Sequence, residues 1–259
     1  MTVLNLLTDK SNSLILTNAE KISINSSIST LQSRLNFYFG DKISKQLIFG
    51  SYARETILPR SIDTQSDVDY MVLFPHNSIV KPSSSIERLI QFSNKKYSTS
   101  EIVRSHPTSV LKLNHIMFEL VPAYQNIFGA YFIPAPKSNW EDWMPTDPIG
   151  FNQDINNKNK ENKYLIKPLV RLIKYWNVKN GYIYESFLLE KQVVSGWYFG
   201  CNNLKDYFFK AIENLNINGL SIANTQKVNR AKSSVTKIKQ YYSSGSEYSA
   251  VLELQKLLS

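Results

Sequence analysis

The chain has 259 residues, of which 42% are hydrophobic and 12% aromatic, so a disordered protein is excluded and one large domain or two modest ones are expected. The net charge of +9 predicts a polyanionic partner, nucleic acid or nucleoside triphosphates, although a lysine-rich proteome would give the same balance. The single cysteine, Cys201, excludes an internal disulfide and a cysteine zinc site. Without an apolar stretch of roughly 18 residues or a basic signal region, we expect a cytoplasmic protein with no membrane partner.

The N-terminal part of the chain combines helical and strand patterns. Apolar spacing of three and four predicts helices at residues 24–35 and 86–92, the first of them capped by Ser13 or Thr17. Runs rich in β-forming residues predict strands at residues 46–49, 68–74, 101–104, 109–113, 116–121 and 131–133. A short helix is predicted over residues 52–56, before Pro59, and a hairpin turn at Asn114-His115. Such closely spaced hairpins predict a mixed sheet.

The pattern becomes helical beyond a segment marked by Pro145, Pro148 and Gly150. Helices are predicted at residues 165–176, 186–199, 204–215 and 249–258, with Pro168 beginning or kinking the first. The predicted fold class is therefore α+β. We expect a catalytic lobe at residues 1–145, whose N-terminal helix either stays in it or spans both lobes, and a mostly helical lobe at residues 146–259.

Three carboxylates carry the clearest chemical signal. Asp67 and Asp69 are two residues apart in a predicted strand, so both side chains project from the same face, about 6–7 Å apart along the chain. Two carboxylates placed in this way repel each other unless cations lie between them. Mg²⁺, or Mn²⁺ in its place, is the cation expected at such a site. Glu119 interrupts an apolar strand, where a charge without a partner is costly. The three residues together predict a two-metal site for phosphate chemistry.

The turn at Gly50-Ser51 predicts a phosphate site. Glycine allows close approach of the backbone, a following helix would present free N–H groups to an anion, and Ser51 adds a hydroxyl donor. Each signal alone also has an ordinary structural explanation: a common turn, a solvated acidic pair, a salt-bridged glutamate. Their order along the chain favours metal-assisted nucleotidyl transfer, with Asp67, Asp69 and Glu119 as catalytic metal ligands.

The motifs at residues 49–56 (FGSYARET) and 66–72 (SDVDYMV) resemble the signature of polymerase-beta-type nucleotidyltransferases. Further motifs are similar to those of the bacterial relatives of cyclic GMP-AMP synthase and oligoadenylate synthase, the signalling enzymes of anti-phage systems. They lie at residues 57–60, 119–124, 131–134, 146–148 and 171–177. The resemblance covers roughly residues 46–195.

The resemblance implies a polymerase-beta-like nucleotidyltransferase fold and a set of nucleotide-binding residues. Asp67 and Asp69 would bind Mg²⁺ and Ser51 the triphosphate. Lys174 corresponds to a family lysine that contacts the triphosphate, and Ser186 to a polar residue that faces the nucleotide tail. Glu119 departs from the usual aspartate of the family by one methylene group.

The secondary signals have ordinary structural alternatives. The lysines between residues 158 and 179 predict a solvated helix face, except for Lys174 and, left open, Arg171. The basic stretch at residues 227–242 is expected to be an exposed linker or helix. Arg54 is expected either to reach phosphate or to pair with a neighbouring carboxylate. Tyr124 is assigned to the core, with stacking on a base as the alternative. The tryptophans are assigned to the core, and the three histidines lack metal-ligand spacing.

The resemblance implies an ATP-binding or other NTP-binding nucleotidyltransferase that makes a cyclic or short linear oligonucleotide second messenger for antiviral defence. A nucleic-acid or protein activator is an expected partner. The first alternative applies the same chemistry to tRNA or RNA 3′ ends or to a protein. The second is a catalytically silent nucleic-acid-binding module, which the three intact carboxylates argue against.

Overall fold

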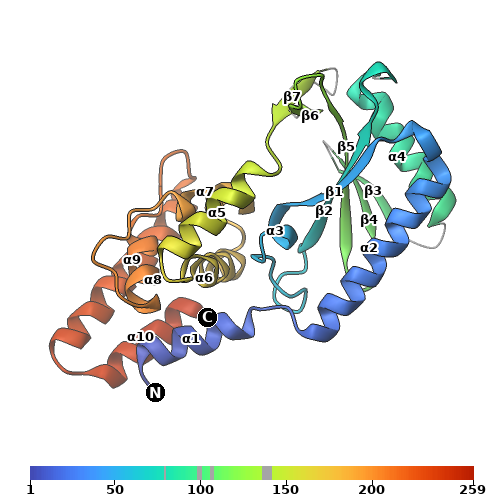
Figure 1. Ribbon diagram of the computed structural model, residues 1–259. Helices are drawn as coiled ribbons and strands as arrows, with labels where there is room; N and C mark the ends of the chain where they lie inside the picture. The colour runs from blue at the N-terminus through green and yellow to red at the C-terminus, as the bar shows by residue number, and fades with distance from the viewer. Residues whose placement is uncertain (79, 98–100, 106–107, 136–141) are drawn as a thin grey trace. The chain divides into compact units, whose positions relative to one another are not determined.

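The computed structural model describes residues 1–78, 80–97, 101–105, 108–135 and 142–259 (Figure 1). The chain forms two compact units: a sheet unit, Leu16–Arg60 and Gln65–Gln153, and a helical unit, Met1–Ile15, Ser61–Thr64 and Asp154–Ser259. These units differ from the predicted lobes because the first 15 residues pack with the helical unit and the division comes after residue 153. The assignment of catalysis to residues 1–145 stays a prediction.

A mixed seven-stranded sheet forms the centre of the sheet unit. Its strands are β1 (Lys45–Phe49), β2 (Asp67–Phe74), β3 (Glu101–Ser105), β4 (Thr108–Lys112), β5 (Met117–Gln125), β6 (Tyr131–Pro134) and β7 (Trp143–Thr146). The order is β1-β2-β5-β4-β3, and β6 pairs with both β5 and β7. Only the β2–β5 pair is parallel among the described pairs. The predicted mixed sheet and the hairpin between β4 and β5 are thus confirmed, and β7 is an additional strand.

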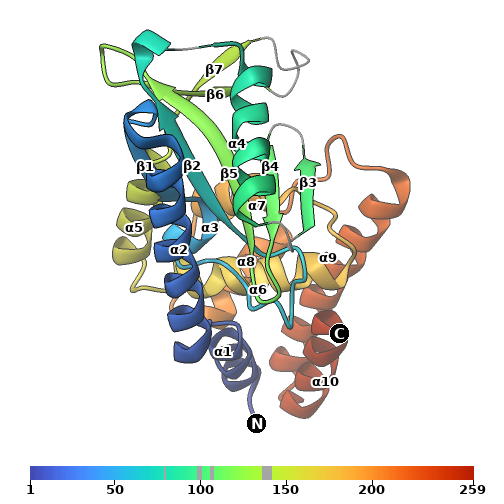
Figure 2. The same cartoon turned by 90° about the vertical axis from the view of Figure 1, so that its right-hand side faces the viewer.

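Alternation along β2 separates a helix-covered face of the sheet from the face that carries the carboxylates. Val68, Tyr70, Val72 and Phe74 point into the larger core, beneath helices α2 (Asn18–Phe39) and α4 (Pro82–Lys96). Both helices lie along the same face of the sheet (Figure 2). Because the side-chain period of a strand is two, Asp67 and Asp69 project to the opposite face.

Local sequence explains where α2 and α4 begin. Thr17 caps α2 through a capping box, in which its hydroxyl accepts from the backbone N–H of Glu20 and the Glu20 carboxylate accepts from the N–H of Thr17. This confirms one of the two predicted caps. Pro82 occupies the first turn of α4, where its missing N–H costs nothing.

The helical unit contains α1 (Val3–Ser13), most of α5 (Gly150–Glu161), α6 (Ile166–Lys179), α7 (Ser186–Val194), α8 (Leu204–Glu213), α9 (Ile222–Ser243) and α10 (Glu247–Leu258). Helix α6 is its core element, with Leu169, Leu172 and Trp176 almost fully buried. Pro168 lies in the first turn of α6, as predicted, where it leaves the helical ladder intact.

Three helices are absent from the sequence prediction or left open by it. Helix α1 is not predicted, and α5 has the pattern of a polar stretch because only Ile155 and Asn159 of its residues are buried. Helix α9 replaces the linker alternative: Val228, Ala231 and Val235 recur at helical spacing and are buried, between polar neighbours that obscure the pattern.

Two predicted helices are shorter in the structure. Helix α7 ends at Val194, just before Gly196, and not at residue 199. The helix predicted at residues 52–56 is a single turn, α3 (Gly50–Ala53), because Glu55 has a left-handed backbone with φ of 61°. A non-glycine residue in that region stops helical hydrogen bonding. Within the described part of the chain, each helix is too short or too polar to cross a membrane.

Candidate functional site

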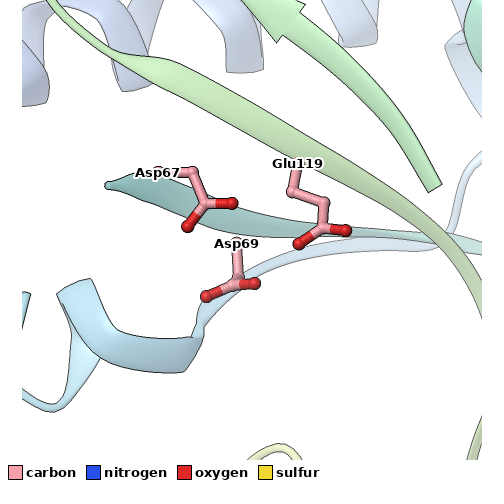
Figure 3. A group of neighbouring side chains, drawn as sticks. All are labelled: Asp67, Asp69 and Glu119. Atoms are coloured by element: carbon pink, nitrogen blue, oxygen red, sulfur yellow. The ribbon is translucent and has the colours of Figure 1, made fainter. Parts of the chain in front are cut away.

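The three predicted carboxylates meet on one face of the sheet. Asp67 and Asp69 lie on β2, and Glu119 lies on the neighbouring strand β5, in register with Asp69. Carboxylate oxygens of the three residues all lie within 4.8 Å of one another. Figure 3 shows the side chains converging on a common point from the two strands. The structure therefore brings together Asp69 and Glu119, which are 50 positions apart in the chain. The sequence predicted that they meet but not which residues of the two strands pair.

Gly50 closes one side of this cluster. Its φ is +70°, and a Cβ atom built there would lie 1.5 Å from Asp69 Oδ2. Residue 50 follows Phe49, which pairs with Asp69 across the β1–β2 ladder, so the turn passes directly against the carboxylate. Only glycine tolerates both the backbone conformation and the contact. Gly50 thus shapes the carboxylate site as well as the turn.

The backbone after Gly50 folds back on itself instead of continuing as a helix. The carbonyl oxygen of Ser51 accepts hydrogen bonds from the N–H groups of Thr56 (2.9 Å) and Ile57 (3.1 Å). The Ser51 side chain is half-exposed. Helix α3 has only four residues, so it contributes little helix dipole at this turn. Phosphate binding at this turn would rest on the backbone N–H groups and the Ser51 hydroxyl.

Burial and, after it, repulsion between the carboxylates both disfavour the charged form of Asp69. Burial raises the pKa of Asp69 well above its usual value, and the charges of Asp67 and Glu119 raise it further. The positive charge of Arg54 acts in the opposite direction. Arg54 is buried and its guanidinium lies 5.1 Å from the centre of the Phe151 ring. The sequence left its role open between phosphate and a carboxylate, and the structure places its charge within electrostatic reach of Asp69.

The residues of the cluster fit a divalent cation. Three carboxylate groups offer hard oxygen donors within 4.8 Å of one another, which is the donor type that Mg²⁺ and Mn²⁺ prefer. A bound cation would remove the repulsion that raises the pKa of Asp69. The group of Asp67, Asp69 and Glu119 is therefore able to hold a metal ion.

Asp69→Asn is expected to stabilise the metal-free protein at neutral pH. The pKa of Asp69 is higher in the folded than in the unfolded protein. Asp69 therefore contributes its whole stabilisation only below the ordinary carboxyl pKa of about 3.9, where the side chain is protonated in both states. That contribution is lost as the pH rises through the raised pKa. The Asn side chain does not ionise, so the variant avoids this loss. Its melting temperature near pH 7 should be about 2–4 °C above that of the parent protein, which corresponds to a gain of ~1 kcal/mol in the free energy of unfolding for a protein of this size. Calorimetry in EDTA across pH checks the sign, and an equal advantage at acidic and neutral pH would contradict it.

Lys174 and Ser186 belong to the helical unit. Lys174 lies on α6 and is buried, with its Nζ 3.3 Å from Oε1 of Glu190 on α7. Ser186 is the exposed first residue of α7. Their assignment to the nucleotide therefore stays a prediction that rests on the resemblance. Sequence reasoning missed Glu190, although a glutamate after Leu188-Leu189 in an apolar helix was a signal for a buried charge.

The buried Lys174–Glu190 pair is expected to be strongly coupled. Glu190→Gln or Lys174→Met should each lower the free energy of unfolding by about 3 kcal/mol, because each removes a charge that the other contacts in the interior. The double variant should lose less free energy of unfolding than the two single variants lose together. Urea unfolding of the parent protein, both single variants and the double variant measures this double-mutant cycle. The half-exposed Lys239–Glu213 pair is the matched control, and Glu213→Gln should cost less than ~1 kcal/mol. Additive losses in the buried cycle would exclude the coupling.

The other basic residues mostly have structural roles. Of the lysines and arginines between residues 158 and 179, Arg171 and Lys174 are buried, Lys158 and Lys167 are half-buried, and Lys160, Lys163 and Lys179 are exposed, so the predicted solvated face is confirmed only for the last three. On α9, Lys227 donates to the carbonyl oxygen of Asn180 at the end of α6, at 2.7 Å. Lys232 likewise donates to the carbonyl oxygen of Leu215, at 2.8 Å. These contacts anchor α9.

The core assignment of the aromatic residues is confirmed only in part. Tyr124 stacks on Phe132 (4.9 Å between ring centres) and meets Trp143 edge-on, and Tyr124 and Trp143 are both half-buried. Trp176 is buried, whereas Trp197 is 71% exposed and stacks on Phe199. Trp140 and His106 lie outside the described residues. His76 and His115 take no part in the ligand cluster.

Comparison with known proteins identifies the family. The model of the Second Messenger Oligonucleotide or Dinucleotide Synthetase domain matches residues 1–159. The chain is 31% identical over 106 residues to a probable cyclic nucleotide synthase of Bacillus cereus, covering 38% of this chain and 31% of that protein. It is 27% identical over 135 residues to a cyclic AMP-AMP-AMP synthase of Acinetobacter, covering 51% of this chain and 38% of the relative. The matches thus span about a third of each relative's length.

Solved structures agree with the fold. The structure of Escherichia coli CdnC with ATP has a TM-score of 0.74 at 13% identity, covering 98% of this chain and 97% of that one. The Vibrio cholerae DncV cyclic AMP-GMP synthase, solved with a linear intermediate, has a TM-score of 0.75 at 10% identity, covering 93% and 91%. The α+β, polymerase-beta-like fold predicted from the sequence is confirmed. With a family model that matches more than half of its residues, the chain belongs to the second messenger oligonucleotide or dinucleotide synthetases.

Proposed function

We propose that this protein is a template-independent, Mg²⁺-dependent nucleotidyltransferase that joins nucleotides from NTPs into a cyclic or short linear oligonucleotide. The observation that carries the proposal is the carboxylate cluster of Asp67, Asp69 and Glu119 against the backbone of Gly50. Membership of the family and the names of the relatives support the same activity. We further propose, from the resemblance to the anti-phage signalling enzymes, that the product is an antiviral messenger made in the cytoplasm. ATP is a proposed substrate because related structures hold ATP or GTP.

The proposed reaction is the attack of a ribose hydroxyl on the α-phosphate of an NTP. A new P–O bond forms, the bond to the β-phosphate bridging oxygen breaks, and pyrophosphate leaves. A divalent cation held by the three carboxylates would supply positive charge to the phosphate oxygens and favour ionisation of the hydroxyl. Glu119 is the carboxylate we assign to the side of the attacking hydroxyl, where it accepts the proton or directs it to solvent.

The remaining residues of the proposal bind and orient. Backbone N–H groups at Gly50-Ser51 and the Ser51 hydroxyl would hold the triphosphate, so that the α-phosphate faces the carboxylates. Arg54 offsets part of the negative charge of the cluster, because it lowers the pKa of Asp69 while burial and the two other carboxylates raise it. Lys174 and Ser186 are proposed triphosphate contacts on the strength of the resemblance.

Incubation with four labelled NTPs and Mg²⁺ or Mn²⁺, followed by phosphatase and chromatography, tests the proposal. We expect a small phosphatase-resistant product for a cyclic messenger, and a phosphatase-sensitive ladder for a linear one. Label found only on added tRNA or protein would instead establish the alternative acceptor. No product with any acceptor, in protein that binds NTP, would favour the silent module. Asp9→Asn, at an exposed position of α1, is the control for a lost carboxylate.

Two replacements of Glu119 are expected to distinguish the effect of its charge from the effect of its side-chain length. Glu119→Gln should lower the turnover rate about 100-fold or more, because it removes one of three charges that face a bound cation. Glu119→Asp keeps the charge and shortens the side chain by one methylene group, so a loss of about tenfold is expected. Mn²⁺ affinity measured by calorimetry should follow the same order. If Glu119→Gln binds Mn²⁺ as the parent protein does, Glu119 is not a ligand.

A further inference from the structure

A hollow lies in the sheet unit, away from the carboxylates. It has a volume of about 1010 Å³, at the upper limit of the range for small-molecule sites. The C-terminal end of α2, the end of β2 and one side of α4 form its walls. Phe74, at the end of β2, lies roughly 23 Å along the strand from Asp67 at ~3.3 Å per residue, and on the opposite, helix-covered face. The hollow is therefore separate from the candidate metal site.

The walls of the hollow combine aromatic rings with cations. Phe39 and Phe74 form the base, packed edge to face at 5.7 Å and anchored in the core. Phe37, one of the lining residues, is 81% exposed. Helix α4 contributes Arg88 and Lys95, which recur at helical spacing and so line the same side. Among the described residues that line the hollow, Lys42, Arg88, Lys95 and Lys96 are cationic and Asp41 is acidic.

Arg88, Lys95 and Lys96 each have an aromatic ring as a neighbour. Lys96 Nζ lies 4.5 Å from the centre of the Phe37 ring, and the Arg88 guanidinium lies 5.5 Å from that of Phe74. Within the described residues, neither side chain forms an ion pair. An exposed cation–ring contact is weak, about 0.5–1 kcal/mol, whereas charge-assisted hydrogen bonds to phosphate are much stronger. An anion with an aromatic ring would use both kinds of group at once.

We propose that this hollow binds a nucleotide, with phosphate on Arg88 and Lys95 and the base stacked on Phe37. A free mononucleotide and one nucleotide of a single-stranded nucleic acid share this chemistry. The ordinary explanation, a lysine-rich surface in a chain of net charge +9, predicts phosphate binding without preference for a base. A nucleotide site should therefore prefer a ligand that has both a base and a phosphate over one that has only a phosphate, whereas a lysine-rich surface should not.

Calorimetric titration of the full chain with AMP, in EDTA, tests the proposal. We expect AMP to bind at least tenfold more tightly than ribose 5-phosphate or adenosine. Arg88→Ala/Lys95→Ala should weaken AMP about tenfold or more, and Phe37→Ala about three- to tenfold, since both chemical groups contribute. Lys21→Ala, an exposed lysine at the other end of α2, is the matched control and should change nothing. Phe37, Lys95 and Lys21 are exposed and Arg88 is half-buried, so circular dichroism is used to verify that each variant folds.

The outcomes are distinct. A single-stranded hexanucleotide that binds at least tenfold more tightly than AMP identifies a nucleic-acid strand as the source, and equal or weaker binding identifies the free nucleotide. Three results would overturn the proposal: no heat with millimolar AMP, equal affinity for AMP and ribose 5-phosphate, or equal effects of Lys21→Ala and the hollow variants. None of these outcomes depends on nucleotidyl transfer, so the hollow and the proposed activity stand or fall separately.

Discussion

Asp69→Asn is expected to abolish nucleotidyl transfer, with a loss of about 10³-fold or more. Asp69 is the central carboxylate: it is paired in register with Glu119 and on the same face as Asp67. Its replacement leaves a neutral amide where a charged oxygen would face a bound cation. Electrostatic stabilisation of the transferring phosphate contributes a large share of the rate enhancement in such catalysis, so the loss should be large.

Product formation from labelled NTPs measures this loss, and Mn²⁺ calorimetry measures the binding of the cation. The variant should keep its fold, because the same substitution relieves repulsion in the metal-free protein. Lost activity with raised thermal stability would therefore distinguish a functional carboxylate from a structural one. If the variant retains activity within tenfold of the parent, the assignment of the metal site to β2 and β5 is wrong.

Gly50→Ala is expected to have the second largest effect. The new Cβ would lie 1.5 Å from Asp69 Oδ2, so either the turn or the carboxylate must move. The φ of +70° adds the cost of a left-handed backbone, about 1–2 kcal/mol. We expect activity to fall at least 100-fold and the free energy of unfolding to fall by about 3 kcal/mol.

Gly129→Ala is the matched control for this prediction. Gly129 lies in the same unit with φ of +84°, but the nearest atom to an added Cβ is 3.7 Å away. It should therefore lose about 1–2 kcal/mol of stability from backbone strain alone and keep its activity. Activity assays and urea unfolding compare the two variants. Equal activity in both would show that the contact between Gly50 and Asp69 has no part in the reaction.

Much of the sheet could be predicted from the sequence because the patterns that specify its strands lie within short segments of the chain. Alternation in residues 68–74 placed Asp67 and Asp69 on one face without knowledge of any neighbour. The capping box at Thr17 and Glu20 is likewise complete within one helical turn. The polar helices α5 and α9 were harder, since few of their residues are apolar and their burial depends on partners distant in the sequence.

The sequence by itself determined the chemistry: three carboxylates and a glycine-serine turn, in an order along the chain that predicts nucleotidyl transfer. Tertiary structure alone decided how these groups meet. The β2–β5 register set Glu119 opposite Asp69, and the β1–β2 ladder brought Gly50 against the same carboxylate. It also buried Glu190 beside Lys174. Residue type and spacing are written along the chain, whereas register and close approach arise from pairing between distant segments, which no local pattern encodes.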